Sequence, residues 1–456
     1  MVSLREDRLH SADSGKAHRT DFRRDRDSIF YSNFFRRLAG VTQVVHVAEG
    51  HVFHNRLVHS LKVAQIGQSL ADILISKTKR DIIKDVGGVD VDVVQTACLA
   101  HDLGHPPFGH IGESELSKCV EERKVREGFE GNAQSFRIVS RLAIHDERHP
   151  GLNLTSASLN AMLKYPWKRR LPEEGKDVTK ELECKKWGCY DSDDESFALA
   201  RARDPESKRK SAEAEIMDWA DDVTYAIHDL DDFYRAGLVP LDRILAGGIE
   251  LDRFLEWISA KEELNSADSE AARKFLGNLE SDRRSDLLMP FQGTSAQYRA
   301  LRSLETRVIQ RLLGLQAKDG RAHLELRPAE ASRLYIADEL ALEVKVLKGL
   351  MRLYVYDAPA LAVQQHGQRK IVRELFEILF NAVDSTNKKT SPAIIPKPFD
   401  ENLKELARLS GEELRVNQVR LVADMIASLT EQQAVSYYAR LSGTSLGFLA
   451  DRIFGA

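Results

Sequence analysis

The chain has 456 residues, 43% of them hydrophobic and 30% charged, which is the profile of a globular protein with a substantial buried core. Its 66 Lys and Arg against 70 Asp and Glu give a formal net charge of −4. This balance argues against nucleic acid as the main partner, because duplex binders usually carry a basic excess. No apolar run approaches the roughly 20 residues of a membrane span, so we expect no membrane partner.

Cysteine usage and the N-terminal composition favour a cytoplasmic protein. The chain has only four cysteines, and reduced thiols in a cytoplasm fit this number well. Cys184 and Cys189 lie in a polar segment with no second Cys or His pair nearby, so a zinc knuckle is a weak alternative. The first residues lack the apolar core of a signal peptide, and they mix Arg with Asp and Glu, unlike a transit peptide.

The first part of the chain shows helical periodicity interrupted by loops. Residues 1–19 are polar, and we expect them to be flexible. Gly104 and the following Pro106-Pro107 are expected to end a strongly apolar helix. The stretch 40–55 is predicted as a loop with short extended pieces. The spacing of apolar residues predicts helices over 25–38, 55–75, 90–103, 113–124, 132–145 and 155–163.

The rest of the chain contains one irregular segment and then further helices. The segment at about 168–211 is charged, contains Pro, Gly and two cysteines, and lacks sustained periodicity, so we expect an exposed irregular or β-hairpin excursion. Helical patterns resume at Ala212 and dominate to the end. No βαβ alternation and no Gly-rich phosphate loop is present. The sequence therefore predicts an all-α fold, with a core over 20–240 and a helical C-terminal region over 241–456.

Histidines are concentrated in one part of the chain. A single histidine is most often a core or surface residue with a satisfied hydrogen bond, so the cluster has to be judged by its geometry. Of the 14 histidines in the chain, seven lie between positions 46 and 110: His46, His51, His54, His59, His101, His105 and His110.

The adjacent pair His101-Asp102 comes at the end of the apolar helix predicted over 90–103. Neighbouring residues on a helix point about 100° apart, but at a helix end they can converge on one cation. Burying both side chains is unfavourable without a partner, and a metal ion would supply one; a buried His–Asp hydrogen bond is the alternative. The run HDLGHPPFGHIGE then places His105, His110 and Glu113 just beyond the helix.

A second informative stretch is EAEIMDWADDVTYAIHDLDD, over 213–232. Asp221, Tyr225 and Asp229 are spaced i, i+4 and i+8, so they lie on one face of a helix. An acidic face is often only the solvated side of a surface helix. Here apolar residues surround the acids, and a buried acid needs a cation or a hydrogen-bond donor.

His59, in NRLVHSLKVAQI, completes a candidate metal-binding set with His101, Asp102 and Asp221. Two neutral imidazoles and two carboxylates suit Mn²⁺, Mg²⁺, Fe²⁺ or Zn²⁺ without selecting strongly among them.

Several stretches of the chain together resemble the deoxyguanosine triphosphate triphosphohydrolase family of the HD-domain superfamily. The match spans roughly residues 19–240, and a weaker one, RLVADMIASLTEQQAVSYYARLSG, lies near the C-terminus. HD alone is a weak signal, whereas HDLGHPPFGHIGE followed by GFEGNAQSFRI is highly specific. The other matching stretches are RRDRDSIFYSNFFRRLAGVTQV, HNRLVHSLKVA, LNLTSASLNAMLKYPW and DWADDVTYAIHDLDD.

This resemblance implies an activity and a role for individual residues. The implied reaction is hydrolysis of dGTP or other dNTPs at the α-phosphate, giving a deoxynucleoside and triphosphate. It requires a divalent metal, most often Mn²⁺ or Mg²⁺, with Fe²⁺, Co²⁺, Ni²⁺ and Zn²⁺ as alternatives. The implied site comprises metal ligands His59, His101, Asp102 and Asp221 (rather than Asp222), catalytic His110 with its orienting Glu113, His105 near the phosphates, Arg56 at the α-phosphate, Gln43 and Tyr225 at the deoxyribose, and Asp229 at its 3′-hydroxyl.

The resemblance also implies partners. Family members use dNTPs as substrates and as allosteric effectors, form homo-oligomers that are often hexamers, and can respond to single-stranded DNA. The chain departs from many members at Val41, Gln68 and Leu429-Thr430-Glu431. None of these positions belongs to the implied metal set, so the departures bear on base preference and control.

Three other functions fit part of the pattern. One is another HD-type enzyme, such as a nucleotidase or a cyclic-nucleotide phosphodiesterase. The second is a nucleotide sensor that binds without turnover. The third is a nucleic-acid-binding module that uses the arginines over 19–37; there, Asp21, Asp25 and Asp27 interleave with the arginines, which is more typical of intramolecular pairing or a subunit interface.

Overall fold

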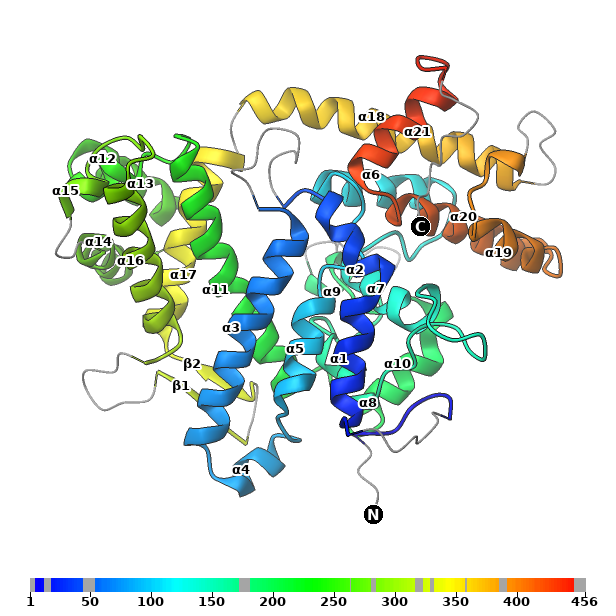
Figure 1. Cartoon of the computed structure of the whole chain (residues 1–456), viewed down its shortest axis with the longest axis horizontal. Coiled ribbons are helices and arrows are strands. Elements are labelled where there is room, and N and C mark those ends of the chain that lie inside the picture. The colour runs from blue at the N-terminus through cyan, green and yellow to red at the C-terminus, as the bar shows by residue number, and fades with distance from the viewer. Residues whose placement is uncertain are drawn as a thin grey trace.

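Helices make up nearly all the regular structure of the chain (Figure 1). The structure is a computed structural model, and it describes residues 5–11, 18–43, 54–171, 181–262, 264–279, 284–315, 323–328, 332–356, 359–384 and 392–446. Within these ranges the one sheet has two strands, and no helix is long and apolar enough to cross a membrane. The predicted all-α class is therefore confirmed.

Three helices form the centre of the molecule: α3 (Arg56–Lys77), α5 (Val91–Ala100) and α11 (Ala212–Arg235). Each of them packs against the other two, and they lie side by side in Figure 1. Gly67 lets α3 approach α5 closely, since a Cβ there would lie 2.6 Å from Cys98 Sγ. The central core therefore depends on a small residue at this crossing.

The helix predicted over 25–38 is divided at Ser32. α1 (Asp21–Tyr31) ends there, because Ser32 has extended backbone angles and its side chain caps α2 (Asn33–Arg37) by accepting a hydrogen bond from Phe35 N. Serine favours such a cap over a helix interior, since its hydroxyl competes for backbone groups. A 3₁₀ turn over Leu38–Gly40 follows, and Thr42 then bridges to Asn55.

The helices beyond the centre match the predicted ones with shifted bounds. α6 begins at Gly109 rather than 113, because the backbone of Phe108 adopts a left-handed conformation just before it. The helix predicted over 132–145 is α7, followed by a π-helical turn. These elements are α6 (Gly109–Glu122), α7 (Gly131–Arg137), the π turn Ile138–Leu142 and α8 (Ser156–Ala161). The short helix α4 (Arg80–Asp85) was not predicted.

The described part of the predicted excursion at 168–211 is irregular, with short helices and no strand. The antiparallel hairpin lies elsewhere, where β1 (Leu324–Leu326) pairs with β2 (Leu334–Ile336). The segment is also less exposed than expected, because Trp187, Cys189 and Tyr190 are buried in it. Its elements are α9 (Leu182–Lys185), the 3₁₀ turn Asp191–Asp193 and α10 (Asp194–Arg201).

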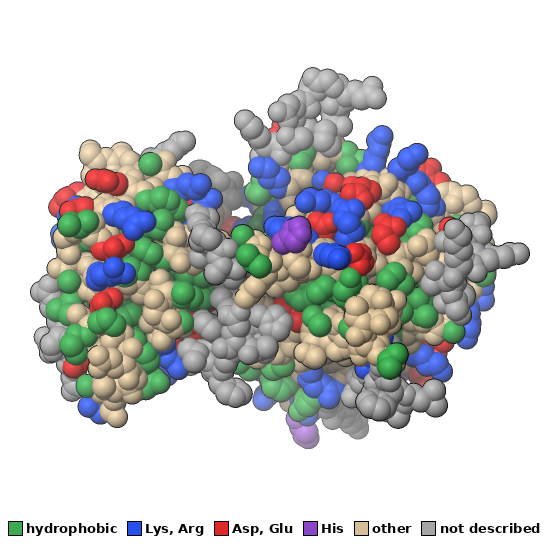
Figure 2. Space-filling view, turned by 90° about the horizontal axis from the view of Figure 1, so that it is seen from above, with side chains coloured by type: hydrophobic (Ala, Val, Ile, Leu, Met, Phe, Trp, Pro, Cys, Tyr) green, Lys and Arg blue, Asp and Glu red, His purple; other side chains and the backbone are tan. Residues whose placement is uncertain are grey.

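The C-terminal region forms two groups of helices at opposite ends of the molecule (Figure 1). Seen from above, both ends of the molecule carry Lys and Arg mixed with Asp and Glu (Figure 2). One group packs on α11 and contains α12 (Leu241–Ala246), α13 (Ile249–Glu262), α14 (Ser266–Asn278), α15 (Arg284–Leu287), α16 (Ser295–Leu312), α17 (Asp338–Met351) and the π turn Arg352–Tyr356. The other packs on α6 and contains α18 (Pro359–Val383), the 3₁₀ turn Pro392–Ile394, α19 (Phe399–Leu406), α20 (Gly411–Ala427) and α21 (Glu431–Leu441). Packing on the core is thus observed, while contact with neighbouring subunits stays a prediction.

A buried ion pair joins the second C-terminal group to the core. Arg137 on α7 donates from Nε to Asp424 Oδ1 over 3.0 Å and from Nη2 to Oδ2 over 2.9 Å. Gln134 Nε2 also donates to Asp424 Oδ1, over 2.8 Å. Asp424 is only 1% exposed, so its charge is balanced by these groups rather than by water.

We expect Asp424→Ala to lower the free energy of unfolding by about 3–5 kcal/mol, because it leaves the buried Arg137 without its main counter-charge. Urea unfolding followed by circular dichroism measures the change. Glu412→Ala is the matched control, since Glu412 is exposed and pairs with Arg415 at 3.5 Å on the surface; its effect should stay within about 0.5 kcal/mol. Equal unfolding midpoints for the two variants would contradict this prediction.

Candidate active site

Three potential metal ligands converge where the central helices meet. His59 comes from α3, His101 from the end of α5 and Asp221 from the middle of α11, and their ligand atoms lie within 4.8 Å of one another. His59 Nε2 is 3.0 Å and His101 Nε2 is 3.6 Å from Asp221 Oδ1. The neighbouring Asp222 instead pairs with Lys348, so Asp221 is the member of the Asp-Asp pair that reaches both imidazoles.

The protonation pattern of His101 fits a metal ligand. Its Nδ1 lies 2.7 Å from the carbonyl oxygen of Cys98, and a carbonyl can only accept, so Nδ1 carries the proton. Nε2 then presents a lone pair toward Asp221, and it is buried without a hydrogen-bond partner among the described residues. A ligating histidine typically has this arrangement, in which the outer nitrogen donates to a backbone carbonyl. The residues present therefore fit a divalent cation.

Asp102 adjoins this trio but is shared with other groups. Its Oδ2 lies 3.6 Å from His101 Nε2 and accepts a hydrogen bond from Arg56 Nη1 over 2.7 Å. Its Oδ1 lies 3.0 Å from His105 Nδ1. Burial opposes its ionisation, but the positive charge of Arg56 outweighs burial and holds the pKa of Asp102 well below its ordinary value. The adjacent His and Asp therefore do converge at the helix end.

Lys164 is a site residue that the sequence did not reveal. It follows α8, and its Nζ lies 3.0 Å from Asp221 Oδ2 and 2.7 Å from Asp218 Oδ1. Burial opposes ionisation of Asp221, but Lys164 and the two histidines lower the pKa of Asp221 well below its ordinary value. No spacing rule could connect position 164 with 221; only the tertiary packing of the two segments does.

His110 and Glu113 form a second cluster on the first turns of α6. His110 Nδ1 lies 2.9 Å from Glu113 Oε2, and the His110 side chain is 74% exposed. Glu113 is buried, and its Oε1 accepts from Gly131 N over 3.1 Å and from Lys186 Nζ over 3.0 Å. Burial opposes its ionisation, but the hydrogen bond with His110 and the charge of Lys186 hold the pKa of Glu113 well below its ordinary value.

His105 lies between the two clusters. Its ring is 5.3 Å from the ring of His110, centroid to centroid. Burial and the nearby Arg56 lower the pKa of His105 to about 4, although Asp102 opposes this effect. His105 is therefore a neutral imidazole at physiological pH.

The four residues expected at the substrate can each be described by their own contacts. Arg56 is buried, and its Nε donates to the carbonyl oxygen of Thr42 over 3.0 Å. Gln43 Oε1 is buried without a hydrogen-bond partner among the described residues. Tyr225 and Asp229 share one face of α11, as predicted, and Tyr356 from the distant π turn joins them by hydrogen bonds to Tyr225 Oη and, over 3.5 Å, to Asp229 Oδ2.

Asp229 differs electrostatically from the other acids of the site. Burial and the nearby carboxylate of Asp232 raise the pKa of Asp229 well above its ordinary value, and Arg56 only partly opposes this. Its carboxyl group can therefore donate a hydrogen bond as well as accept one. Tyr356 could not be found from the sequence, because it lies in a segment for which no site motif was recognised.

Glu431, one of the departures from the family pattern, supports the loops of the site. Its buried carboxylate accepts hydrogen bonds from Thr42 N over 2.9 Å and from Phe108 N over 3.1 Å. Phe108 has φ +67°, an unfavourable conformation for a residue with a Cβ, and the hydrogen bond holds it there. The first residue of α21 thus fixes the backbone beside Gln43 and before His110.

Two other features of the sequence can be placed. The four cysteines are buried and free, and no cluster of potential metal ligands among the described residues includes one. In the arginine-rich stretch, Arg19 pairs with Asp27 at 2.8 Å and Arg8 with Asp25 at 2.7 Å. These contacts agree with intramolecular pairing of the interleaved acids.

The chain matches known families over both of its halves. Residues 56–226 match the HD domain, and residues 334–440 match a phosphohydrolase-associated domain. A deoxyguanosinetriphosphate triphosphohydrolase-like protein of Streptomyces coelicolor is 34% identical, over 93% of this chain and 93% of its own length. The chain belongs to this family.

Further relatives carry the same name. The protein from Corynebacterium efficiens is 32% identical over 94% of this chain and 93% of its own length, and the one from Bifidobacterium longum is 32% identical over 93% and 83%. The resemblance inferred from the motifs is confirmed, and the protein is an HD-type phosphohydrolase. The matched HD region contains His59, His101, Asp102 and Asp221.

We expect Lys186→Met to lower kcat about tenfold, because Glu113 would lose its charged contact with Lys186 and would be held against His110 only by the Gly131 amide among the contacts given above. Loss of the ammonium group also raises the pKa of Glu113, so the carboxylate becomes protonated at higher pH. The acid limb of the kcat–pH profile should therefore move to higher pH.

Two controls sharpen this test. Lys186→Arg keeps the charge and should restore most of the rate and the position of the acid limb. Lys185→Met removes a neighbouring lysine that has no contact with Glu113 among the interactions described above. If Lys186→Met and Lys185→Met show the same pH profile as the unchanged protein, Lys186 does not tune Glu113.

Proposed function

We propose that this phosphohydrolase is a metal-dependent dNTP triphosphohydrolase that acts on dGTP or other dNTPs. The water oxygen bonds to the α-phosphorus, the bond from phosphorus to the 5′ oxygen breaks, and the products are a deoxynucleoside and intact triphosphate. The observation that carries this proposal is the Nε2 of His101, which has no hydrogen-bond partner among the described residues and faces Asp221 and His59. His105 links this trio to the His110–Glu113 pair, because it contacts both Asp102 and the His110 ring. The names of the relatives favour dGTP as a substrate.

The metal would be held by His59, His101 and Asp221, with Asp102 as the fourth ligand. We propose Mn²⁺ or Mg²⁺ as the preferred metal. Fe²⁺, Co²⁺, Ni²⁺ and Zn²⁺ are alternatives, because mixed imidazole and carboxylate ligands bind all of these ions. A divalent cation at this position polarises a phosphate and lowers the pKa of water. Arg56 and Lys164 lower the pKa values of Asp102 and Asp221 by more than burial raises them, so both carboxylates are already ionised and can bind a cation.

His110 is the proposed base. Glu113 keeps the proton on Nδ1, so Nε2 can accept a proton from the attacking water. Arg56 would stabilise the negative charge that grows on the phosphate oxygens. His105, which is neutral at physiological pH, would donate a hydrogen bond to the phosphates from its ring N–H.

Sugar recognition would depend on α11 and the loop before α3. Asp229, with its raised pKa, suits a hydrogen bond with the 3′-hydroxyl, and the free carbonyl of Gln43 can accept one. Tyr225 would pack against C2′ and leave no room for a 2′-hydroxyl. Tyr356 would hold Tyr225 in this position through their hydrogen bond.

Other expectations remain proposals. The family resemblance is the basis for proposing homo-oligomerisation, for example as a hexamer, allosteric dNTP binding and a response to single-stranded DNA. A cytoplasmic location is proposed from the resemblance and from the cysteine usage. Another HD-type nucleotidase or phosphodiesterase differs in its products, and a nucleotide sensor would bind without turnover. The retained His110–Glu113 pair favours turnover.

Incubation with dGTP and Mn²⁺ should yield deoxyguanosine and triphosphate in equal amounts, because attack occurs at the α-phosphorus. Chromatography with phosphorus NMR identifies both products, and the assay should include all four dNTPs singly and mixed. Pyrophosphate, a monophosphate or no turnover under any mixture would exclude this activity. A product pair from GTP at the same rate would contradict the proposed role of Tyr225.

We expect His101→Ala to weaken Mn²⁺ binding by more than about 100-fold and to abolish measurable turnover, since it removes one of four ligands. Metal content by mass spectrometry and calorimetric titration with Mn²⁺ measure the effect. His149→Ala, a change at a half-buried histidine stacked on His10, is the matched control and should bind metal normally. Normal metal content in His101→Ala would show that the ligand set is wrong.

A further inference from the structure

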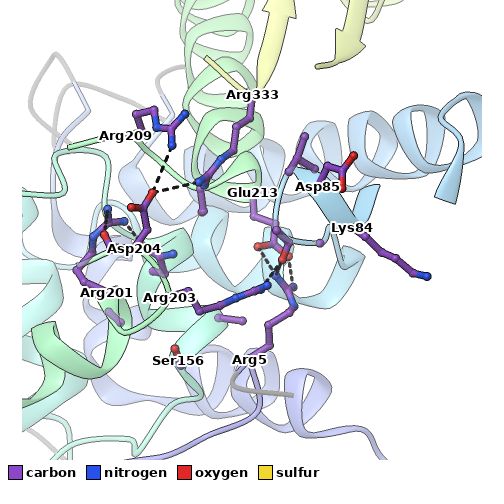
Figure 3. Close-up of a pocket in the computed structure, with 17 residues that line it drawn as sticks. Arg5, Lys84, Asp85, Ser156, Arg201, Arg203, Asp204, Arg209, Glu213 and Arg333 are labelled. Atoms are coloured by element: carbon purple, nitrogen blue, oxygen red, sulfur yellow. Dashed lines mark hydrogen bonds and ion pairs between the residues drawn. The ribbon is translucent and has the colours of Figure 1, made fainter. Parts of the chain in front are cut away.

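A second polar cavity lies away from the proposed catalytic centre, where the first turn of α11 meets α4, α8 and the end of α10 (Figure 3). Its volume is about 270 Å³. Six cationic side chains line it, from Arg5, Lys84, Arg201, Arg203, Arg209 and Arg333. Only three acids do so: Asp85, Asp204 and Glu213.

A pair of glycines brings two of these arginines together. The carbonyl oxygen of Gly87 accepts hydrogen bonds from Arg5 Nη1 over 2.9 Å and from Arg203 Nη1 over 2.7 Å. Gly88 has φ +97°, and a Cβ there would lie 3.0 Å from the Arg5 guanidinium. The Arg5 guanidinium is also paired with the carboxylate of Glu213, and a second cation, Arg203, reaches the same neutral carbonyl.

Arg201 adds a buried cation that is bonded to neutral groups. It is 3% exposed, and it donates to Asn160 Oδ1 over 2.8 Å and to the carbonyl oxygen of Ser207 over 2.6 Å. Its Nε is buried without a partner among the described residues. Burial lowers the pKa of Arg201, and Arg333 adds to this effect while Asp204 opposes it.

Two of the three acids of the cavity are already engaged. Asp204 Oδ2 lies 3.6 Å from both Arg209 Nη2 and Arg333 Nη2, and Glu213 pairs with Arg5. Burial lowers the pKa of Arg333 as well, with Arg209 as the next cause. Among the residues that line the cavity, six cations therefore stand against three acids.

We propose that this cavity binds an oligophosphate chain, either free triphosphate or the phosphate tail of a nucleotide. Guanidinium groups recognise phosphate oxygens through paired, charge-assisted hydrogen bonds, and several of them here face one enclosed space. Glu213 precedes Asp221 by eight residues on α11, which is about 12 Å along the helix axis, so this is a separate site. The inference does not depend on the proposed hydrolytic reaction.

Calorimetric titration of the full chain with tripolyphosphate, in EDTA to prevent turnover, tests the proposal. Arg203→Gln should weaken binding at least about tenfold, because it removes a charged hydrogen-bond donor. Lys84→Gln is a second variant at an exposed lysine of the same cavity, in case the first alters the fold; circular dichroism without ligand checks both. Arg253→Gln, at an exposed residue outside the cavity, is the matched control and should bind normally.

Parallel titrations with dGTP and deoxyguanosine distinguish the two sources of phosphate. Any binding at the catalytic centre is common to the unchanged protein and the variants, so it cancels in the comparison. If Arg203→Gln weakens the binding of both tripolyphosphate and dGTP, the cavity accepts the phosphate tail of a nucleotide. If the variant weakens the binding of tripolyphosphate alone, the cavity binds the free chain. The proposal is overturned if folded Arg203→Gln and Lys84→Gln bind tripolyphosphate as the unchanged protein does, or if Arg203→Gln weakens deoxyguanosine equally.

Discussion

The contact on which the site depends is the meeting of His59, His101 and Asp221, one from each of the three central helices. The positions of their ligand atoms are set by the packing of α3, α5 and α11, since no two of the three residues are neighbours in the sequence. The close approach of α3 and α5 at Gly67 is part of this packing. Because catalysis responds to displacements of about 1 Å, core packing and site chemistry cannot vary independently here.

The charges around this contact are arranged so that the ligands need little change in protonation to receive a cation. Burial alone would neutralise Asp102 and Asp221, but Arg56 and Lys164 keep them ionised. His101 already presents its free nitrogen, because Cys98 fixes the proton on the other one. At Asp229 burial and the nearby Asp232 outweigh the opposing effect of Arg56, so the pKa of this acid is raised instead. One helix therefore carries carboxyl groups in two different states.

The parts of this arrangement that depend on local patterns could be predicted from the sequence. Apolar spacing located the central helices, and the His-Asp pair and the i, i+4, i+8 acids marked the site. Other features of the structure could not be predicted from these patterns. The helix predicted over 25–38 is divided at Ser32, because the hydroxyl of Ser32 caps the next helix. Lys164, Lys186 and Tyr356 reach the site only through tertiary packing. The charged segment that carries Lys186 looked wholly exposed, since its buried aromatics show no periodicity.

Glu431 ties this local chemistry to the far end of the chain. It lies 323 residues from Phe108 in sequence, yet its carboxylate is the acceptor that satisfies the amides of Phe108 and Thr42. A protease cut between α20 and α21 that released the last helix would leave two buried amides without an acceptor. The catalytic loops would then loosen although no residue in contact with substrate had been removed, which makes the integrity of the C-terminus a condition for activity.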